Sequence, residues 1–384
     1  MVSDSTRLTR LIQRLDFARP GKAFDEGWYV APPGRDHVAA RIVERFERSA
    51  APRLLFLGGI GAGKSTALLA AQRRLGGRAH YVAIDTLFDE GGARPGALLV
   101  IAGLAIVHAL RAVDGTLASR LRPTWKLLHR SLRVRGRPST GLVDLSLVGD
   151  GVSESPETVL GHLETLAEDW RDARAHGAPP VVLLVDSLDR RTWSQFDAAV
   201  VPDLRALASY DVGVAIAGST AWRVAMDDLG DSFHAVWTAD VYDPNDADAR
   251  GFLRAVLAAR DEGALAEDVR DAVIECSGGV LRDLLKVADT AARDAAMEGS
   301  DVVEVRHVDA AAVAMGEDAI GLLTPSLRGR FGRWCRGEAP EEGDRPLDDG
   351  VFESLRARGC VVERGGRWAV HPLLQRAKGL GRGA

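Results

Sequence analysis

Residues 58–65 carry glycines and one lysine at the spacing of a phosphate-binding loop. The segment from Gly58 to Ser65 reads G-G-I-G-A-G-K-S and fits the pattern G-x-x-x-x-G-K-[ST]. Such a loop turns several backbone N–H donors towards one phosphate, and glycines let the chain approach without a Cβ in the way. We expect the Lys64 ammonium to reach the β- and γ-phosphates and the Ser65 hydroxyl to ligate Mg²⁺. The predicted nucleotide contacts of this loop are Gly59, Ile60, Gly61, Ala62, Gly63, Lys64, Ser65 and Thr66.

A phosphate-binding loop needs an acid at the end of a second buried strand, where the carboxylate orients Mg²⁺. The run V-V-L-L-V-D, from Val181 to Asp186, is almost continuously apolar and predicts a strand that is buried on both faces. Because Asp186 ends this run, we predict that it completes the magnesium site with Ser65. The alternative is that Asp186 only caps the end of its strand.

The residue that activates the attacking water is harder to identify. Ser187 follows Asp186 directly, and a serine hydroxyl does not act as a base at neutral pH. Asp189 lies three residues after Asp186 and could reach the site through a tight turn. We therefore predict Asp189 as the acid that orients the water, and we expect slow hydrolysis.

Short apolar strands alternate with helices around these residues, which predicts an α/β fold with a mainly parallel sheet. This context disfavours the alternative that the glycine loop is a strand-to-helix turn without a ligand. The predicted strands are Arg53 to Leu57, His80 to Ile84, Val181 to Asp186, Val212 to Ala217 and His234 to Val241. The predicted helices are Val38 to Ser49, Lys64 to Leu75, Ala97 to Val113, Pro156 to His176 and Asp197 to Ser209.

The pattern changes after Val241, where a run of helices continues to about Met315. Further on, Phe352 to Gly359 has helical spacing, and C-V-V-E-R-G-G-R-W-A-V predicts a β-hairpin around the turn Gly365-Gly366. Helix and hairpin together predict a small winged-helix-like module. The predicted divisions are an N-terminal segment 1–35, a P-loop core 36–241, a helical lid 242–316 and a winged-helix-like domain 317–384.

A basic stretch interrupts the predicted core. The segment from Arg120 to Ser155 is expected to be irregular, and its first part, up to Ser139, contains many arginines, Trp125 and no acid. It could be an inserted loop that binds nucleic acid or a partner. It could equally be a solvated helix and loop, which is the interpretation that we prefer.

These motifs, taken in order, resemble the AAA+/STAND branch of P-loop ATPases, the initiator-like proteins with a C-terminal winged helix. Asp186-Ser187-Leu188-Asp189 resembles the second acidic motif of STAND proteins. The segment from Cys276 to Leu285, with its pair of glycines followed by Arg282, resembles the sensor 2 segment, in which a lid helix presents an arginine to the γ-phosphate.

The resemblance implies further site residues. Arg282 would report the γ-phosphate, Ser219 or Thr220 would stand at the sensor 1 position, and Tyr29 and Val30 would lie beside the adenine. The same residues also have plainer interpretations. Arg282 could be an exposed arginine at an ordinary helix junction, and Ser219 and Thr220 could cap the next helix. Tyr29 and Val30 could form a hydrophobic anchor. Beyond these positions, Arg223 could act on a neighbouring subunit as an arginine finger.

We expect a switch that binds ATP or ADP with Mg²⁺, hydrolyses ATP slowly and controls a separate effector or sensor protein, for example in bacterial defence or regulation. The alternative is a DNA-associated ATPase of the initiator or transposition-regulator type, which would use the winged helix and the basic loop. A third interpretation is nucleotide binding without turnover. The resemblance also implies a homo-oligomer. For the winged helix, autoinhibitory packing on the core competes with DNA contact, and the acidic stretch from Glu338 to Asp349 weakens the DNA interpretation.

Composition places few limits on partners. The formal charge is −5 and 46% of the residues are hydrophobic, as expected of an ordinary globular protein. The three cysteines lack metal-ligand spacing and fit a reducing cytoplasm. The N-terminus lacks the apolar region of a signal peptide. The apolar stretch from Ala97 to Leu110 is too short to span a bilayer, which takes about 20 residues, so we expect a buried helix and no membrane partner.

Overall fold

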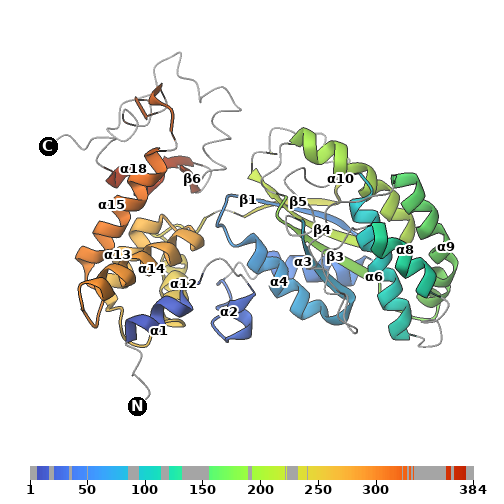
Figure 1. The fold of residues 1–384 in the computed structure, drawn as a ribbon, viewed down its shortest axis with the longest axis horizontal. Helices are drawn as coiled ribbons and strands as arrows, with labels where there is room; N and C mark the ends of the chain where they lie inside the picture. The colour runs from blue at the N-terminus through green and yellow to red at the C-terminus, as the bar shows by residue number, and fades with distance from the viewer. Residues whose placement is uncertain are drawn as a thin grey trace. The chain divides into compact units, whose positions relative to one another are not determined.

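The computed structural model of the chain divides by its contacts into two compact units (Figure 1). The helical unit comprises Met1–Asp36, Gly59–Gly63 and Ala239–Ala384, and the sheet unit comprises His37–Gly58 and Lys64–Thr238. The residues that the structure describes are 7–16, 21–33, 37–49, 51–84, 95–113, 121–131, 155–188, 193–220, 222, 232–239, 241–321, 323–326, 328–329, 332, 360–364 and 367–377.

A five-stranded sheet forms the centre of the sheet unit, in the order β2-β3-β4-β1-β5. The pairs β2 with β3, β3 with β4, and β4 with β1 are parallel. These pairs confirm the predicted α/β fold with a mainly parallel sheet. The strands are β1 (Arg53–Gly58), β2 (Ala79–Ala83), β3 (Val181–Asp186), β4 (Val212–Ser219) and β5 (Ala235–Ala239).

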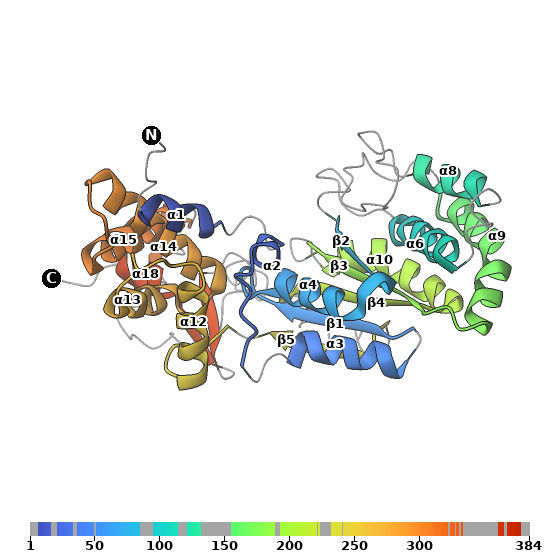
Figure 2. The same ribbon diagram turned by 90° about the horizontal axis from the view of Figure 1, so that it is seen from below.

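Successive side chains along each strand point to opposite faces of the sheet. Leu55, Leu183 and Val214 share a core with α6 (Ala97–Val113), α9 (Pro156–Ala175) and α10 (Trp193–Leu207). Helices α3 (His37–Arg48) and α4 (Lys64–Leu75) cover the opposite face, as Figure 2 shows. Gly213 lies on this second face, because a Cβ there would meet the ring of Phe46 from α3. The short helices η1 (Gly76–Arg78) and η2 (Ala208–Tyr210) follow α4 and α10.

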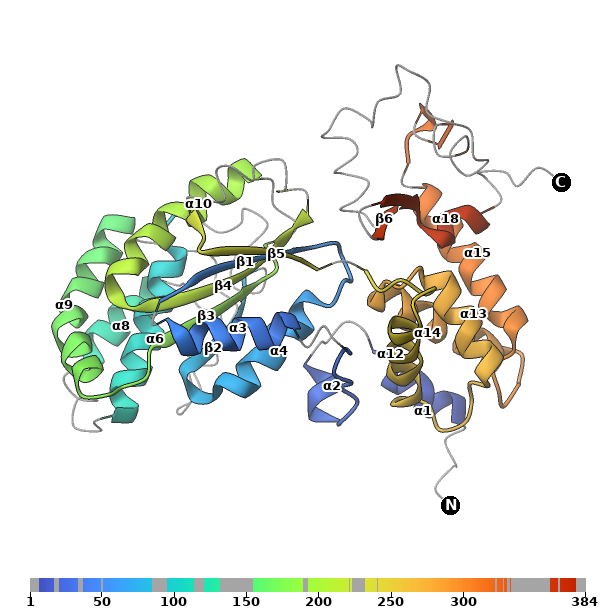
Figure 3. The same cartoon turned by 180° about the vertical axis from the view of Figure 1, so that it is seen from behind.

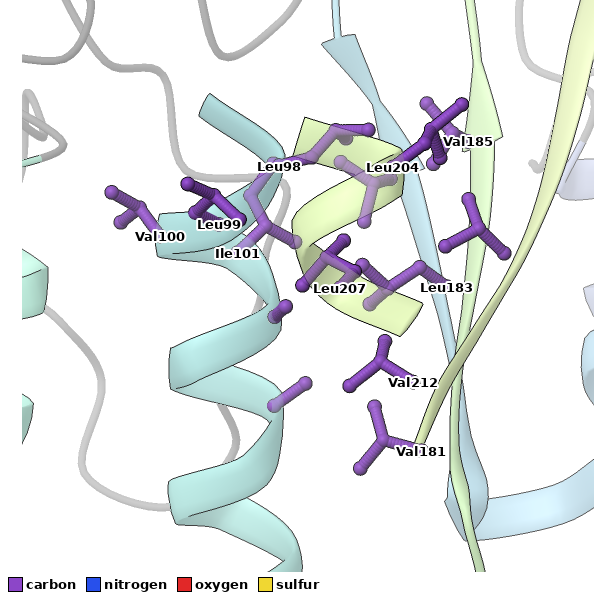
Figure 4. Close-up of a cluster of buried hydrophobic side chains, with 14 of the residues drawn as sticks. Leu98, Leu99, Val100, Ile101, Val181, Leu183, Val185, Leu204, Leu207 and Val212 are labelled. Carbon is purple, nitrogen blue, oxygen red and sulfur yellow. The ribbon is translucent and has the colours of Figure 1, made fainter. Parts of the chain in front are cut away.

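Helix α6 is buried, as predicted from its apolar run. In Figure 4, Leu98 and Ile101 lie on the side of α6 that faces α10 and the strands, and Val100 points away from the strands. The buried carboxylate of Asp203, on α10, accepts hydrogen bonds from the backbone amides of Gly96 at 2.8 Å and Leu98 at 3.0 Å. It therefore satisfies N–H groups at the first turn of α6 that have no partner within the helix. Of the helices in the described ranges, not one combines the length and apolar content that a bilayer crossing requires.

The stretch that we expected to be irregular contains helix α8 (Arg122–Ser131). Leu121 and Leu128 are buried and Trp125 packs against the same core, with the Arg111 guanidinium 5.6 Å from its ring. The apolar residues thus recur at helical spacing among the basic ones, so the expectation was wrong for this part. Because Trp125 packs inward, it is not presented as a platform for stacking bases.

The helical unit is built from α12 (Ala247–Ala258), α13 (Glu267–Ser277), α14 (Leu281–Met297) and α15 (Val305–Gly321), together with α1 (Arg7–Arg14) and α2 (Lys22–Asp25). Leu8 and Leu11 of α1, with Leu15 just after it, are buried in the core that α14 also lines. Figure 3 shows α1 beside α14. The Arg10 and Arg14 side chains pair with Glu262. The sequence did not lead us to expect this packing of the N-terminal segment.

The C-terminal part contains the predicted hairpin, formed by β6 (Val361–Arg364) and β7 (Arg367–Val370) in antiparallel pairing. Helix α18 (Pro372–Arg376) follows and packs on α15, where Gly316 lies so close to the Leu373 carbonyl that a Cβ would not fit. The predicted helix from Phe352 to Gly359 lies outside the described residues.

Candidate nucleotide site

Three predicted site residues end strands at the same edge of the sheet. Gly58 ends β1, Asp186 ends β3 and Ser219 ends β4, and the carboxyl ends of parallel strands share one edge. The register pairs Gly58 with Ser219. By strand alternation all three lie on the face that α4 covers, because Gly213 and Ser219 are an even number of residues apart on β4. The helix that begins at Lys64 therefore starts on the same face as Asp186.

Lys64 is almost completely buried at the start of α4, with 5% of its surface exposed. Its ammonium donates a hydrogen bond of 2.9 Å to the carbonyl oxygen of Gly58, the last residue of β1. The bond directs the side chain back towards the end of β1. A buried ammonium at a helix N-terminus, where the helix dipole also favours anions, is suited to binding a phosphate.

Gly61 and Gly63 show why the loop from Gly59 to Gly63 needs glycine. Their φ angles are +82° and +88°, in the left-handed region that residues with a Cβ avoid. The Ala62 amide donates a 3.3 Å hydrogen bond to the Gly59 carbonyl, which closes a turn within the loop. The predicted pattern of glycines thus matches a real conformational requirement of the backbone.

The same loop contacts the first turn of α14 within the helical unit. The Arg282 amide donates a hydrogen bond of 3.4 Å to the Gly61 carbonyl. A Cβ on Gly61 would lie 2.8 Å from both the Arg282 Cβ and the Val280 Cγ1, and one on Gly63 would lie 3.0 Å from the Leu281 Cδ1. Arg282, predicted from its resemblance to sensor 2, is therefore a direct neighbour of the loop, and its side chain is exposed.

The glycine pair before Arg282 also has a structural reason. Gly278 ends α13 in the left-handed conformation, with φ +60°. Gly279 has φ +83° and approaches the Tyr242 carbonyl so closely that a Cβ would overlap it. The glycines are thus required by an ordinary helix junction as well, as the plainer interpretation expects.

Asp186 is 4% exposed, and its carboxylate has a partner that the sequence did not reveal. The Tyr81 hydroxyl, on β2, donates a hydrogen bond of 2.5 Å to the Asp186 Oδ2. Directly after Asp186, Ser187 has φ +67°, which is uncommon for a residue with a Cβ. Strained conformations of this kind cluster at functional sites. Asp189 lies outside the described residues, and so does Arg223.

Tyr29 and Val30 belong to the helical unit. The Tyr29 ring stacks on Phe24, with 4.2 Å between the ring centroids, and Val30 packs against the core of that unit. Just before them, the carbonyl of Trp28 accepts a 3.3 Å hydrogen bond from the buried Arg260 guanidinium. These contacts fit the hydrophobic anchor; contact with an adenine stays a prediction. Ser219 and Thr220 are both buried at the end of β4.

The donors that the chain offers to a metal ion suit Mg²⁺. The Ser65 hydroxyl and the Asp186 carboxylate are oxygen ligands, which hard divalent cations prefer, and Mg²⁺ characteristically keeps several of its waters. No group of three or more His, Cys, Asp or Glu side chains is gathered in a metal-binding arrangement within the described ranges. The residues therefore fit a cation that is held partly by a bound phosphate, rather than an all-protein cage.

No protein-family model and no curated protein matches this sequence. Among solved structures the chain is similar to Drosophila ORC bound to DNA, with 15% identity, 99% of this chain and 93% of that chain covered, and a TM-score of 0.48. It is also similar to Aeropyrum pernix ORC1 in complex with DNA, with 16% identity, 97% of this chain and 95% of that chain covered, and a TM-score of 0.46. A third similar structure is the Thermotoga maritima RuvB Holliday junction branch migration motor, with 11% identity, 89% of this chain and 95% of that chain covered, and a TM-score of 0.44. At these identities and scores, the residues of the site are what indicates a function.

Proposed function

We propose that this protein is a P-loop ATPase of the AAA+ type, which binds ATP with Mg²⁺ and uses its hydrolysis as a switch. The observation that carries the proposal is that Gly58, which leads into the glycine loop, and the buried Asp186 end parallel strands on the face covered by α4, where the buried Lys64 begins that helix. Burying charged groups of both signs at one edge of a sheet costs free energy unless the groups bind a ligand or pair with each other.

Each residue has a distinct part in the proposed reaction. The amides from Gly59 to Thr66 bind the β-phosphate, and Lys64 neutralises charge that develops on the γ-phosphate. Ser65 and Asp186 hold Mg²⁺, which, when bound, offsets the phosphate charge and orients the leaving group. Asp189 orients the water. Ser187 stands where a catalytic glutamate often follows this aspartate, so we expect slow turnover.

The contact between Gly61 and α14 supports a role for Arg282 in reporting the nucleotide state. The Arg282 amide already binds the loop carbonyl, and its exposed side chain starts from the same turn. A charge-assisted bond from this guanidinium to the γ-phosphate would be lost on hydrolysis. We infer that the loss releases α14, together with the helices that pack on it.

Nucleotide binding is tested by titration calorimetry with ATP and ADP, with and without Mg²⁺. We expect Lys64→Ala to weaken ATP binding by about tenfold or more, because a hydrogen-bonded charge contact is removed. Lys126→Ala is the matched control, since Lys126 is exposed on α8. A wild-type chain without nucleotide affinity would refute the proposal. Equal effects of the two substitutions would exclude Lys64 as the phosphate ligand.

Two biological roles follow from this activity, and we favour association with DNA over control of a separate effector protein. The observation in its favour is the register of the hairpin, which pairs Arg364 with Arg367 on the two strands beside the turn. If this hairpin is the wing of a winged helix, the turn between these arginines is the wing tip, and a basic wing tip would favour contact with phosphates. The predicted homo-oligomer belongs to either role.

DNA binding is tested by titrating a fluorescent duplex at several salt concentrations. We expect Arg364→Ala with Arg367→Ala to weaken binding and to reduce the salt dependence by about two released counterions. The pair Arg41→Ala and Arg45→Ala is the control with the same loss of charge, because both residues are exposed on α3, outside the hairpin and the basic stretch. If the wild type has no measurable affinity at low salt, the DNA role fails and the effector switch remains.

A further inference from the structure

The tyrosine hydroxyl that binds Asp186 is a built feature of the site. Tyr81 lies on β2, the edge strand beside β3, and is half-buried. Its Oη is 2.5 Å from Oδ2 of Asp186, within the range of strong bonds between a hydroxyl and a carboxylate. The aspartate is nearly excluded from solvent, so water does not readily replace this partner.

Strand pairing determines the geometry of this contact. The parallel register aligns Tyr81 with Leu184 and Ala83 with Asp186, so Tyr81 is the diagonal neighbour of Asp186 on the same face of the sheet. A diagonal neighbour is too distant for a short side chain but within reach of a tyrosine. A tyrosine at this position of β2 can therefore place its hydroxyl at the carboxyl edge of β3.

The hydrogen bond from Tyr81 makes the two oxygens of the Asp186 carboxylate different from each other. Oδ2 accepts from Tyr81, which fixes the rotation of the carboxylate and leaves Oδ1 as the oxygen directed to other ligands. On the other side of Asp186, the left-handed conformation of Ser187 turns the chain sharply after the strand. Asp186 is thus restrained by the β3 ladder, by the turn and by Tyr81.

We propose that Tyr81 is a positioning residue for the magnesium site, which holds the Asp186 carboxylate in the orientation that binds the Mg²⁺ of the nucleotide complex. This inference rests on the proposed function, because it assigns Tyr81 to the same site. Groups that orient metal ligands from behind commonly affect metal affinity by an order of magnitude or more. We therefore expect the loss of the Tyr81 hydroxyl to weaken Mg²⁺ binding and to leave the affinity for nucleotide without Mg²⁺ unchanged.

The test measures ADP affinity by calorimetry, first in EDTA and then across a Mg²⁺ titration. For Tyr81→Phe we expect an ADP affinity in EDTA within about twofold of the wild type. The Mg²⁺ concentration at which half of the Mg²⁺-dependent increase in ADP affinity is reached should rise by about tenfold, because one hydrogen bond to a charged metal ligand is lost. Tyr210→Phe is the control. Tyr210 lies just before β4, at the amino ends of the strands and away from Asp186, so this substitution should leave both values unchanged.

A double-mutant cycle separates positioning from folding. In an Asp186→Ala background, Tyr81→Phe should no longer shift the Mg²⁺ midpoint, since its target is gone. An unchanged midpoint for the single variant, in a wild type that binds ADP with Mg²⁺, would overturn this inference alone. An equal loss of ADP affinity with and without Mg²⁺ would also overturn it, and would assign Tyr81 to the structure of the strand. A wild type that binds no ADP would overturn the proposed function and this inference together.

Discussion

Substitution of Gly61 by alanine tests whether the glycine loop and α14 are packed as closely as the structure shows. Gly61 has φ +82°, and an added Cβ would lie 2.8 Å from both the Arg282 Cβ and the Val280 Cγ1. The left-handed conformation costs a residue with a Cβ about 1–2 kcal/mol. Crowding a packed contact by one carbon costs about 1–3 kcal/mol more.

Together these terms predict that Gly61→Ala lowers the free energy of unfolding by about 2–5 kcal/mol. This is a large part of the about 5–15 kcal/mol that holds a typical domain together. Gly59→Ala provides a control in the same loop, because its φ is not left-handed and no atom lies within 4 Å of the added Cβ. We expect the control to change stability by less than about 1 kcal/mol.

Urea unfolding of the two variants, followed by circular dichroism, measures this difference. Adding Val280→Ala removes one of the two crowded carbons, so the double variant should be more stable than the sum of the single effects predicts, by about 1 kcal/mol. If Gly61→Ala unfolds at the same urea concentration as Gly59→Ala, the contact between the loop and α14 is not made in solution. If Val280→Ala restores nothing, the cost of Gly61→Ala comes from backbone strain and from the contact with the Arg282 Cβ.

Three further predictions concern single side chains. Burial raises the pKa of Asp203 from 3.8 to about 6, although the amides of Gly96 and Leu98 oppose the shift. The folded chain therefore holds a proton that the unfolded chain has lost between pH 4 and 6, so the free energy of unfolding falls by about 3 kcal/mol as the pH rises through this window. Asp203→Asn should remove the slope in urea unfolding from pH 4 to 7, and an identical slope would show that another group is responsible. Ser187→Gly should raise stability by up to about 1 kcal/mol, because it relieves a left-handed φ; a lower melting temperature would contradict this. Asp189→Ala should slow single-turnover ATP hydrolysis by about a hundredfold, and an unchanged rate would exclude Asp189 as the water-orienting acid.

The sequence predicted best those elements whose environment is uniform. The bounds of β3 and α6 agree with prediction because β3 and all but the last turns of α6 are buried, so that a nearly continuous apolar run marks each element. Helix α8 was missed because the exposed Arg122 and Lys126 lie between its inward-facing residues, so that no continuous apolar run marks the helix. The packing of α1 on α14 depends on a partner far along the chain, which local patterns cannot identify.

The candidate site divides in the same way. The glycine loop is a local feature, because its turns are encoded by the residues that make them, Gly61 and Gly63. The bond from Tyr81 to Asp186 depends instead on β2 lying beside β3, with Tyr81 two residues before the partner of Asp186. Neither the order of the strands nor their register can be deduced from short apolar runs, so no pattern in the sequence pointed to this tyrosine.

The packing of α1 has a consequence for how the protein is made. Leu8, Leu11 and Leu15 leave the ribosome long before α14, against which this segment is buried, because the whole sheet unit lies between them in the sequence. At about 5–20 residues per second, tens of seconds separate the two. During that interval the nascent α1 presents three leucines without their final cover, so we expect chaperones to bind this segment on translating ribosomes. The core of the helical unit can therefore close only after the sheet unit has been synthesised.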